Sequence, residues 1–281
     1  MSNSFFVPGH ITGFFTIENH DVILKRGSCG AGFLLTKGVR TTISPSDELK
    51  IDVNQGDSTV IDAVLRILET DSDFKIVQDI QLPIGAGFGT SAASALSLTL
   101  ALNEFLDLGY SEELCGQIAH MAEVNLGAGL GDVIAQTGKG LVLRVAPGAP
   151  GIGEIKSFEH DVCIAWKTFG GIETSSIIQD PRRQQVIYDV GLKYLEYFEE
   201  KPSMRNFLDF SYNFSHETKL VSDEVKKLID YLNSRHDILG SSMAMLGNTV
   251  FAIAQNEDAF KNLEVEGLHI DKLNNVGIVH D

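Results

Sequence analysis

The sequence predicts an α+β protein with two domains. Its 281 residues exceed the roughly 100–150 that a single domain usually takes, and 43% of them are apolar, which is enough to bury a substantial core. The first half contains a strand, a glycine-rich loop and a helix in direct succession. The second half mixes helices and strands without a regular β-α-β alternation, and this mixture favours the α+β class.

The strand in the first half covers residues 74–82, where apolar and polar side chains alternate as in a half-buried strand. Pro83 ends it, and the glycine-rich loop 85–91 follows. The next segment is rich in Ala and Leu and predicts a helix that ends at Leu106. Because many of its residues are small, this helix can lie deep between its neighbours.

Two more helices are predicted in the first half. One covers residues 57–70, with Asp57 as its N-cap, and the other covers residues 111–125, with Ser111 as its N-cap and two glutamates in its first turn. Both carry apolar stripes.

The domain boundary is predicted after a segment dense in Pro and Gly, residues 146–153, which follows a strand at 141–145. The domains are therefore expected to cover residues 1–155 and 156–281. In the second domain we predict strands at 161–167 and 249–254 and helices at 180–199 and 222–233.

Charge and cysteine content restrict the partners and the compartment. The net charge of −16 repels phosphate backbones and anionic lipid, so neither nucleic acid nor a membrane is an expected partner. The first residues do not have the pattern of a secretory signal, and no apolar stretch reaches the ~20 residues of a membrane span. Cys29, Cys115 and Cys163 are widely spaced, which predicts reduced thiols in the cytoplasm.

Glycine-rich stretches at 27–32, 85–89 and 127–131 are the first candidates for a binding site. A glycine loop between a strand and a helix exposes backbone N–H groups to an anion at the helix N-terminus, and phosphate is the natural candidate. Neither the P-loop pattern nor the dinucleotide fingerprint is present. From the residues alone, loop 85–89 is either a tight turn or a phosphate site.

The string that follows Pro83 resembles the phosphate-loop signature of the GHMP small-molecule kinases. It reads Gly-Phe-Gly-Thr-Ser-Ala-Ala from Gly87 onwards, where the family has Gly-Leu-Gly-Ser-Ser-Ala-Ala. The resemblance implies an N-terminal domain like ribosomal protein S5 domain 2 and a ferredoxin-like C-terminal α+β domain. It also implies that the loop holds the triphosphate of ATP and that Ser91 helps to hold Mg²⁺. The implied nucleotide-binding residues are Pro83, Gly85, Gly87, Gly89, Thr90 and Ser91.

Two carboxylates form the second candidate group. Glu123 and Asp132 are nine residues apart, on either side of a glycine segment. Each alone could be an ordinary solvated carboxylate. Phosphoryl transfer to an alcohol, however, needs a metal ligand and a carboxylate that accepts the hydroxyl proton. The resemblance assigns Glu123 to Mg²⁺ and Asp132 to the base, so that Ser91, Glu123 and Asp132 form the expected catalytic set.

Other segments resemble the archaeal pantoate kinase branch of this family, which phosphorylates the terminal hydroxyl of pantoate on the way to coenzyme A. These are the N-terminal Val-Pro-Gly-His ending at His10, the Gly27–Gly32 stretch, and Arg144. A guanidinium can grip the carboxylate of pantoate bidentately, although Arg144 could also be an ordinary surface residue. His10 and Ser28 are candidates for substrate or phosphate contact, or for a structural hydrogen bond.

Two alternatives stay open for the function. The acceptor could be homoserine, shikimate or a mevalonate-type alcohol, because the shared motifs bind nucleotide and only the pocket reads the acceptor. The chain could also be a catalytically silent nucleotide-binding regulator, which the joint presence of Ser91, Glu123 and Asp132 disfavours. The family often forms homodimers, so a homodimer is a further expectation.

Overall fold

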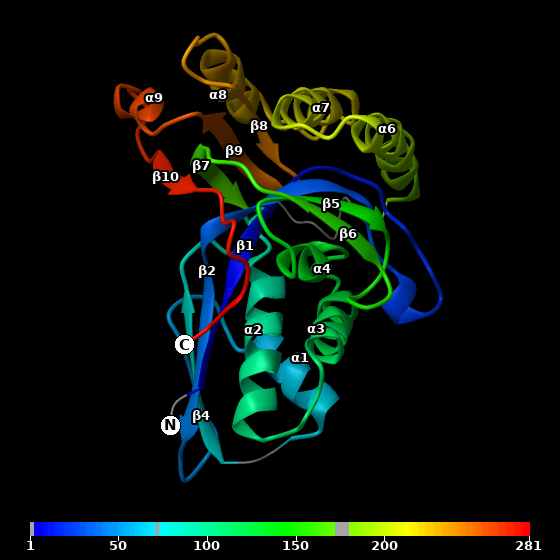
Figure 1. The fold of residues 1–281 in the computed structure, drawn as a ribbon, viewed down its shortest axis with the longest axis vertical. Helices are drawn as coiled ribbons and strands as arrows, with labels where there is room; N and C mark the ends of the chain where they lie inside the picture. The colour runs from blue at the N-terminus through cyan, green and yellow to red at the C-terminus, as the bar shows by residue number, and fades with distance from the viewer. Residues whose placement is uncertain (1–2, 71–72, 172–179) are drawn as a thin grey trace.

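The computed structural model describes residues 3–70, 73–171 and 180–281. A seven-stranded sheet forms one end of the molecule (Figure 1). Its centre is a long antiparallel pair, β1 (Asn3–Phe15) and β2 (Gly30–Pro45). The strand order is β11-β1-β2-β4-β3, and β5 pairs with the start of β2 and with β6. The other strands are β3 (Lys50–Val53), β4 (Phe74–Ile80), β5 (Leu141–Ala146), β6 (Glu154–Phe158) and β11 (Val279–His280).

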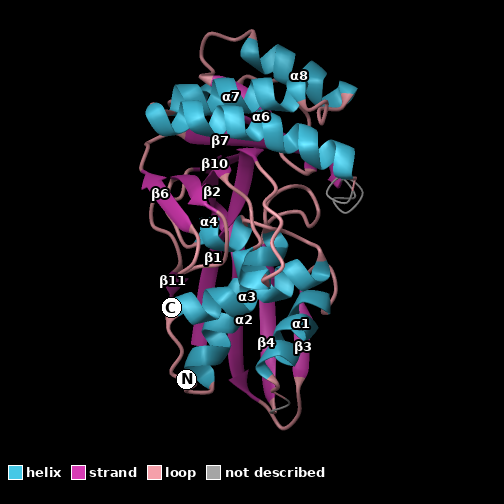
Figure 2. Ribbon diagram, turned by 90° about the vertical axis from the view of Figure 1, so that its right-hand side faces the viewer, coloured by secondary structure: helices cyan, strands magenta, loops and turns pink. Residues whose placement is uncertain are grey.

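Helices cover one face of this sheet (Figures 1 and 2). They are α1 (Thr59–Leu68), α2 (Thr90–Phe105), α3 (Glu112–Leu126) and the short α4 (Asp132–Gln136), while the 3-10 turn η1 (Ile23–Lys25) follows β1. The side chains of α2 are buried from Ala92 to Leu102. The predicted deep position of this helix is therefore confirmed, since its small residues allow the sheet and α3 to pack closely against it.

The predicted N-caps have different outcomes. Ser111 caps α3, because its hydroxyl accepts a hydrogen bond from the backbone N–H of Leu114 at 3.2 Å. The prediction that Asp57 caps α1 is wrong, because the N-cap residue is Ser58. The Asp57 carboxylate instead accepts from the N–H of Thr59 at 2.9 Å, in a local turn just before the helix.

A second, four-stranded antiparallel sheet has the order β10-β7-β9-β8. Helices α7 and α8 pack against it at the top of Figures 1 and 2, and α6 packs beside α7 against β1 and β2. The four elements predicted for this half are confirmed, but α7 was not predicted. Its sequence is rich in Asn, Ser and aromatic residues of modest helix propensity, and burial of Phe207, Leu208 and Phe214 stabilises it. The elements are β7 (Cys163–Gly171), α6 (Pro181–Glu200), α7 (Met204–Glu217), α8 (Asp223–Asn233), β8 (Gly240–Ala244), β9 (Gly247–Ala254), α9 (Asp258–Lys261) and β10 (His269–Lys272).

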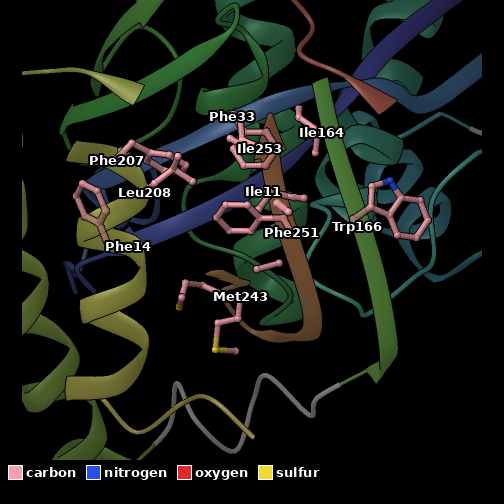
Figure 3. Close-up of a cluster of buried hydrophobic side chains, with 14 of the residues drawn as sticks. Ile11, Phe14, Phe33, Ile164, Trp166, Phe207, Leu208, Met243, Phe251 and Ile253 are labelled. Atoms are coloured by element: carbon pink, nitrogen blue, oxygen red, sulfur yellow. The ribbon is translucent and has the colours of Figure 1, made fainter. Parts of the chain in front are cut away.

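One hydrophobic cluster joins the two sheets (Figure 3). The ring centroid of Phe33 on β2 lies 5.8 Å from that of Phe207 on α7 and 5.1 Å from that of Phe251 on β9. β6 crosses the boundary predicted at 155, and β11 returns the end of the chain to β1. The division into residues 1–155 and 156–281 stays a prediction. Within the described ranges, no helix combines the length and the apolar character needed to cross a membrane.

Candidate active site

A pocket of about 110 Å³ opens where the loop after β4, the turn before α4 and the β8–β9 turn meet. It brings together most of the residues that the sequence analysis selected. Among the described residues, the two selected ones that do not line it are Pro83 and His10. Its lining is Thr12, Phe15, Ser28, Gly85, Gly87, Phe88, Gly89, Thr90, Ser91, Glu123, Ala128, Gly129, Leu130, Gly131, Asp132, Arg144, Met245 and Leu246.

The loop 85–89 has a backbone that suits glycine. Gly85, Gly87 and Gly89 adopt φ angles of 72°, 86° and 58°, in the left-handed region that other residues rarely enter. Gly89 is the N-cap position of α2, and within the described structure no side chain caps that helix. The first-turn N–H groups of a 16-residue helix are thereby left for an anion at the wall of the pocket.

The loop is held from two sides. On one side, the hydroxyl of Thr249 donates to the carbonyl of Ala86 at 2.8 Å, and a Cβ on Gly247 would lie 2.0 Å from the same oxygen. The backbone of the loop and that of β9 therefore approach so closely that only glycine fits at position 247. On the other side, the N–H of His10 donates to the carbonyl of Phe88 at 2.9 Å. The loop is thus fixed to both sheets.

Ser91 and Glu123 face each other across the pocket wall, and the Ser91 hydroxyl donates to Oε1 of Glu123. Glu123 is 3% exposed. Burial raises its pKa to about 7, while the hydrogen bond from Ser91 opposes the shift and the charge of Asp132 adds to it. Hydroxyl and carboxylate oxygens are ligands that suit Mg²⁺. Because no cluster of three or more His, Cys, Asp or Glu occurs among the described residues, further ligands would come from phosphate and water.

The raised pKa of Glu123 predicts how stability depends on pH. Between pH 4.5 and about 7 the folded protein keeps a proton on Glu123 that the unfolded chain has lost, so stability falls as pH rises. From pH 5 to pH 8, wild type should lose about 2 to 3 kcal/mol more unfolding free energy than Glu123→Gln, which cannot titrate. Urea unfolding of both proteins without metal measures the difference. Equal losses would show that Glu123 titrates normally.

Asp132 opens α4 and faces Glu123 across Gly129. A Cβ on Gly129 would lie 2.8 Å from Oε2 of Glu123 and 3.4 Å from Oδ2 of Asp132, so a side chain there would occupy the space between the two carboxylates. Oδ1 of Asp132 lies 2.7 Å from Nδ1 of His10. Burial acts to raise the pKa of Asp132, but the hydrogen bond from His10 and the charge of Arg144 outweigh it and lower that pKa. Asp132 is thereby kept ionised.

Arg144 is a buried cation at the edge of the pocket, not the surface residue that was one alternative. It is 1% exposed, and burial lowers its pKa even though Asp132 acts the other way. Its Nε donates to the carbonyl of Ser28 at 3.2 Å and its Nη1 to the hydroxyl of Thr12 at 3.4 Å. A guanidinium has five donors, and Nη2 has no partner among the described residues. The arrangement suits an anionic ligand.

Two residues that the sequence analysis missed support this site. Thr12 binds Arg144, and it lies two residues after His10 on the same strand. The Gln136 amide donates to the carbonyl of Gly89 at 2.8 Å. Gln136 follows Asp132 by four residues, and this helical spacing could have revealed that both face one way.

Replacing Gln136 with Leu should weaken nucleotide binding by about 3- to 10-fold, because one hydrogen bond to the phosphate loop contributes about 0.5–1.5 kcal/mol. Isothermal titration with Mg·ATP measures the change. Gln255→Leu is the matched control, since its amide also donates to a backbone carbonyl, that of Asp161 at 2.9 Å, on an exposed surface. Equal affinities in the two variants would contradict a role for Gln136 in shaping the loop.

Comparison with known proteins identifies the family. Residues 58–140 match the GHMP kinases N terminal domain. A pantoate kinase from Methanocaldococcus jannaschii is 36% identical over 258 residues, which cover 90% of this chain and 93% of that protein. The chain belongs to the GHMP kinase family. A second archaeal pantoate kinase, from Thermococcus kodakarensis, is 33% identical over 91% of this chain and 89% of its own length.

Two solved structures are similar to this chain over nearly its whole length. A phosphotransferase related to the coenzyme A biosynthesis pathway has a TM-score of 0.87 and 29% identity over 100% of this chain and 99% of its own. The mevalonate kinase from Methanococcus jannaschii has a TM-score of 0.69 at 13% identity and covers 98% of both chains, which shows the shared fold. The predicted GHMP kinase fold of the α+β class and the predicted small-molecule kinase are therefore confirmed.

Proposed function

We propose that this GHMP kinase transfers the terminal phosphoryl group of ATP to the primary hydroxyl of pantoate, giving 4-phosphopantoate and ADP for coenzyme A biosynthesis. The observation that carries the proposal is the buried Arg144, whose guanidinium lines the same pocket as Asp132. A small acid with a hydroxyl group can place its carboxylate on the first and its hydroxyl at the second. The two pantoate kinases of similar sequence support this acceptor.

The nucleotide half of the pocket would bind the triphosphate through backbone N–H groups of loop 85–89 and the first turn of α2. Thr90 and Ser91 begin that helix and line the pocket, while Pro83 would only set the direction of the loop. Ser91 and Glu123 would hold Mg²⁺, which neutralises charge on the phosphates when it is bound. Glu123 must give up the proton that its raised pKa favours before it can act as a ligand.

The acceptor half would be formed by Arg144, Ser28 and Asp132. Arg144 holds the carboxylate, and the Ser28 hydroxyl lies against Gly131 in the wall beside it. Asp132 accepts the proton of the primary hydroxyl while the oxygen of that hydroxyl forms the new bond to the γ-phosphorus. The bond from that phosphorus to the β-phosphate oxygen breaks, and ADP leaves with the electron pair.

The proposal keeps the compartment and the class of partner that the sequence suggested, namely the cytoplasm and a small molecule. Cys29, Cys115 and Cys163 are all free thiols, which is consistent with a reducing cytoplasm. Burial raises the pKa of Cys29 and of Cys115 to about 11, so neither is a ready nucleophile. The net charge of −16 favours a small-molecule partner over nucleic acid, and a homodimer stays a prediction.

A coupled assay of ADP release tests the proposal. Pantoate, homoserine, shikimate and mevalonate are compared as acceptors, and ³¹P NMR identifies the product. We expect turnover with pantoate at a kcat/KM at least about 100-fold above that of the others, since a bidentate ion pair and a placed hydroxyl must both be satisfied. Preference for another acceptor would overturn the pantoate proposal. Binding of Mg·ATP without turnover of any acceptor would indicate a silent nucleotide-binding regulator.

A further inference from the structure

His10 lies behind the pocket and touches only protein. Its side chain is 0% exposed. Among the described residues that line the pocket, His10 is not included. Its only hydrogen-bonded ring nitrogen is Nδ1, at 2.7 Å from Oδ1 of Asp132, while Nε2 has no partner in the part of the chain that the structure describes. A ring placed in this way cannot contact substrate or phosphate. Ligand contact therefore does not explain the presence of a histidine at this position.

An irregularity in the sheet aims this ring at Asp132. The pairing of β1 with β2 shifts between Pro8, opposite Gly38, and His10, opposite Leu34, so β2 has two more residues than β1 over this stretch. Such an irregularity bends the strands locally and changes the direction of a side chain beside it. The ring packs closely against β2, because a Cβ on Gly32 would be only 2.2 Å from Nε2. The absence of a side chain at Gly32 therefore leaves the space that this histidine occupies.

The surroundings decide which nitrogen carries the proton. Burial lowers the pKa of His10, against the raising effect of Asp132, and the charge of Arg144 lowers it further. A neutral ring has one N–H, and only Nδ1 has an acceptor within reach. A proton on Nε2 would leave a buried donor unpaired, and this costs more than an unused lone pair.

We infer that His10 is a positioning residue for Asp132: its Nδ1–H holds Oδ1 of the carboxylate and so directs Oδ2 to the acceptor hydroxyl. The inference rests on the proposed function in giving Asp132 the role of base. Oδ2 is the oxygen that lies toward Gly129 and the pocket. The backbone N–H of His10 also donates to Phe88 in the phosphate loop. One residue of β1 therefore sets the base and the loop relative to each other.

The charged groups around Asp132 come from three elements. His10 approaches from β1 and Arg144 from β5, and both lower the pKa of Asp132. Glu123 lies on α3, and the charge of Asp132 raises its pKa. Arg144 and Glu123 line the pocket and would be engaged by ligands. His10 is the one of the three that a ligand would leave in place.

Activity measurements on two variants test the inference. His10→Ala removes the donor, and His10→Asn places an amide N–H where Nδ1–H was. We expect His10→Ala to lower kcat by about 10- to 100-fold with the KM of ATP and of pantoate unchanged within about 3-fold, because the contact is to the base and not to a ligand. His10→Asn should recover kcat to within about 5-fold of wild type. A risen KM for pantoate with kcat intact would overturn the inference, as would equal kcat losses in both variants.

A double-mutant comparison separates positioning from a general structural effect. In an Asp132→Asn background, His10→Ala should lower the residual kcat by less than about 3-fold, because a residue that acts through Asp132 has little left to affect. The same loss in both backgrounds would contradict the inference. His216→Asn is the matched control: its Nδ1 lies 2.8 Å from the carbonyl of Tyr212, and its Nε2 is buried without a partner among the described residues. It should keep wild-type kinetics.

An NMR measurement on the wild-type protein needs no activity. Spectra of protein with ¹⁵N-labelled histidine, assigned by comparison with His10→Asn, should show a protonated Nδ1 and a bare Nε2 at pH 7. The opposite tautomer would overturn the inference even if the two variants were inactive or failed to fold. If wild type does not phosphorylate pantoate but the Nδ1–H tautomer is found, the proposed function fails while the His10–Asp132 contact stands. The kinetic comparison is then repeated with the acceptor that the panel identifies.

Discussion

Replacing Asp132 with Asn should lower kcat by on the order of 10³-fold, because a positioned general base contributes about 10²- to 10⁴-fold. The amide cannot accept the hydroxyl proton, but its oxygen can still accept the hydrogen bond that His10 now gives to Asp132 at 2.7 Å. The loop 85–89 and Ser91 do not change. Steady-state assays of ADP release should therefore show the loss in kcat, while isothermal titration should show Mg·ATP affinity within about 3-fold of wild type.

Two other variants make the assignment of the base specific. Glu123→Gln should reduce both kcat and Mg·ATP affinity, because Glu123 shares its hydrogen bond with Ser91 beside the phosphate loop. Asp209→Asn, which removes an exposed carboxylate paired with Arg205 at 2.9 Å, should change neither. Turnover at the wild-type rate in Asp132→Asn would remove Asp132 from the mechanism.

Replacing Arg144 with Met should raise the KM for pantoate by about 100-fold, or about 2.8 kcal/mol, because the variant keeps the apolar stem and loses the charged hydrogen bonds. The side chain is 1% exposed, so its contact with a carboxylate is shielded from water. The KM for ATP should stay within about 3-fold. Initial rates over a range of pantoate concentrations measure both values. Because Arg144 also lowers the pKa of Asp132, assays at pH 7 and pH 9 separate binding from ionisation of the base.

The amide of pantoate is a direct probe of this contact. Wild type should discriminate strongly between the acid and the uncharged amide, and Arg144→Met should lose most of that discrimination. Arg205→Met is the control, since Arg205 is exposed and pairs with Asp209 within one helix. If Arg144→Met kept the preference for the acid, the carboxylate would have to bind elsewhere in the pocket.

The sequence predicted the regular elements where one physical signal was enough. The strand predicted over residues 74–82 is β4, although it ends at Ile80, and Ser111 caps α3 as its side chain allows. It did not predict α7, whose 14 residues are helical because Phe207 and Phe214 are buried by the second sheet. Nor did it predict the 13-residue β1, because Gly and Pro in that segment weaken the strand pattern.

The sequence predicted most of the residues that form the candidate site, but not the contacts between them. Asp132, Glu123, Ser91 and Arg144 were selected because their chemistry suits phosphoryl transfer, and the structure places all four at one pocket. His10 was selected as a possible ligand contact but lies outside the pocket lining defined by the described residues. Its partner Asp132 is 122 residues away in the chain, and no local pattern reports such a distance.

By itself the sequence determined which groups are available: a glycine loop before an uninterrupted helix, two carboxylates either side of a glycine turn, and one arginine on the strand that follows. Only the tertiary structure decided how they act, because burial and mutual distance depend on the whole fold. It made Arg144 a buried cation, raised the pKa of Glu123 to about 7, and turned His10 away from the pocket and onto Asp132. Electrostatic interactions of this kind strengthen as water is excluded, and water is excluded only when segments distant in the chain pack together.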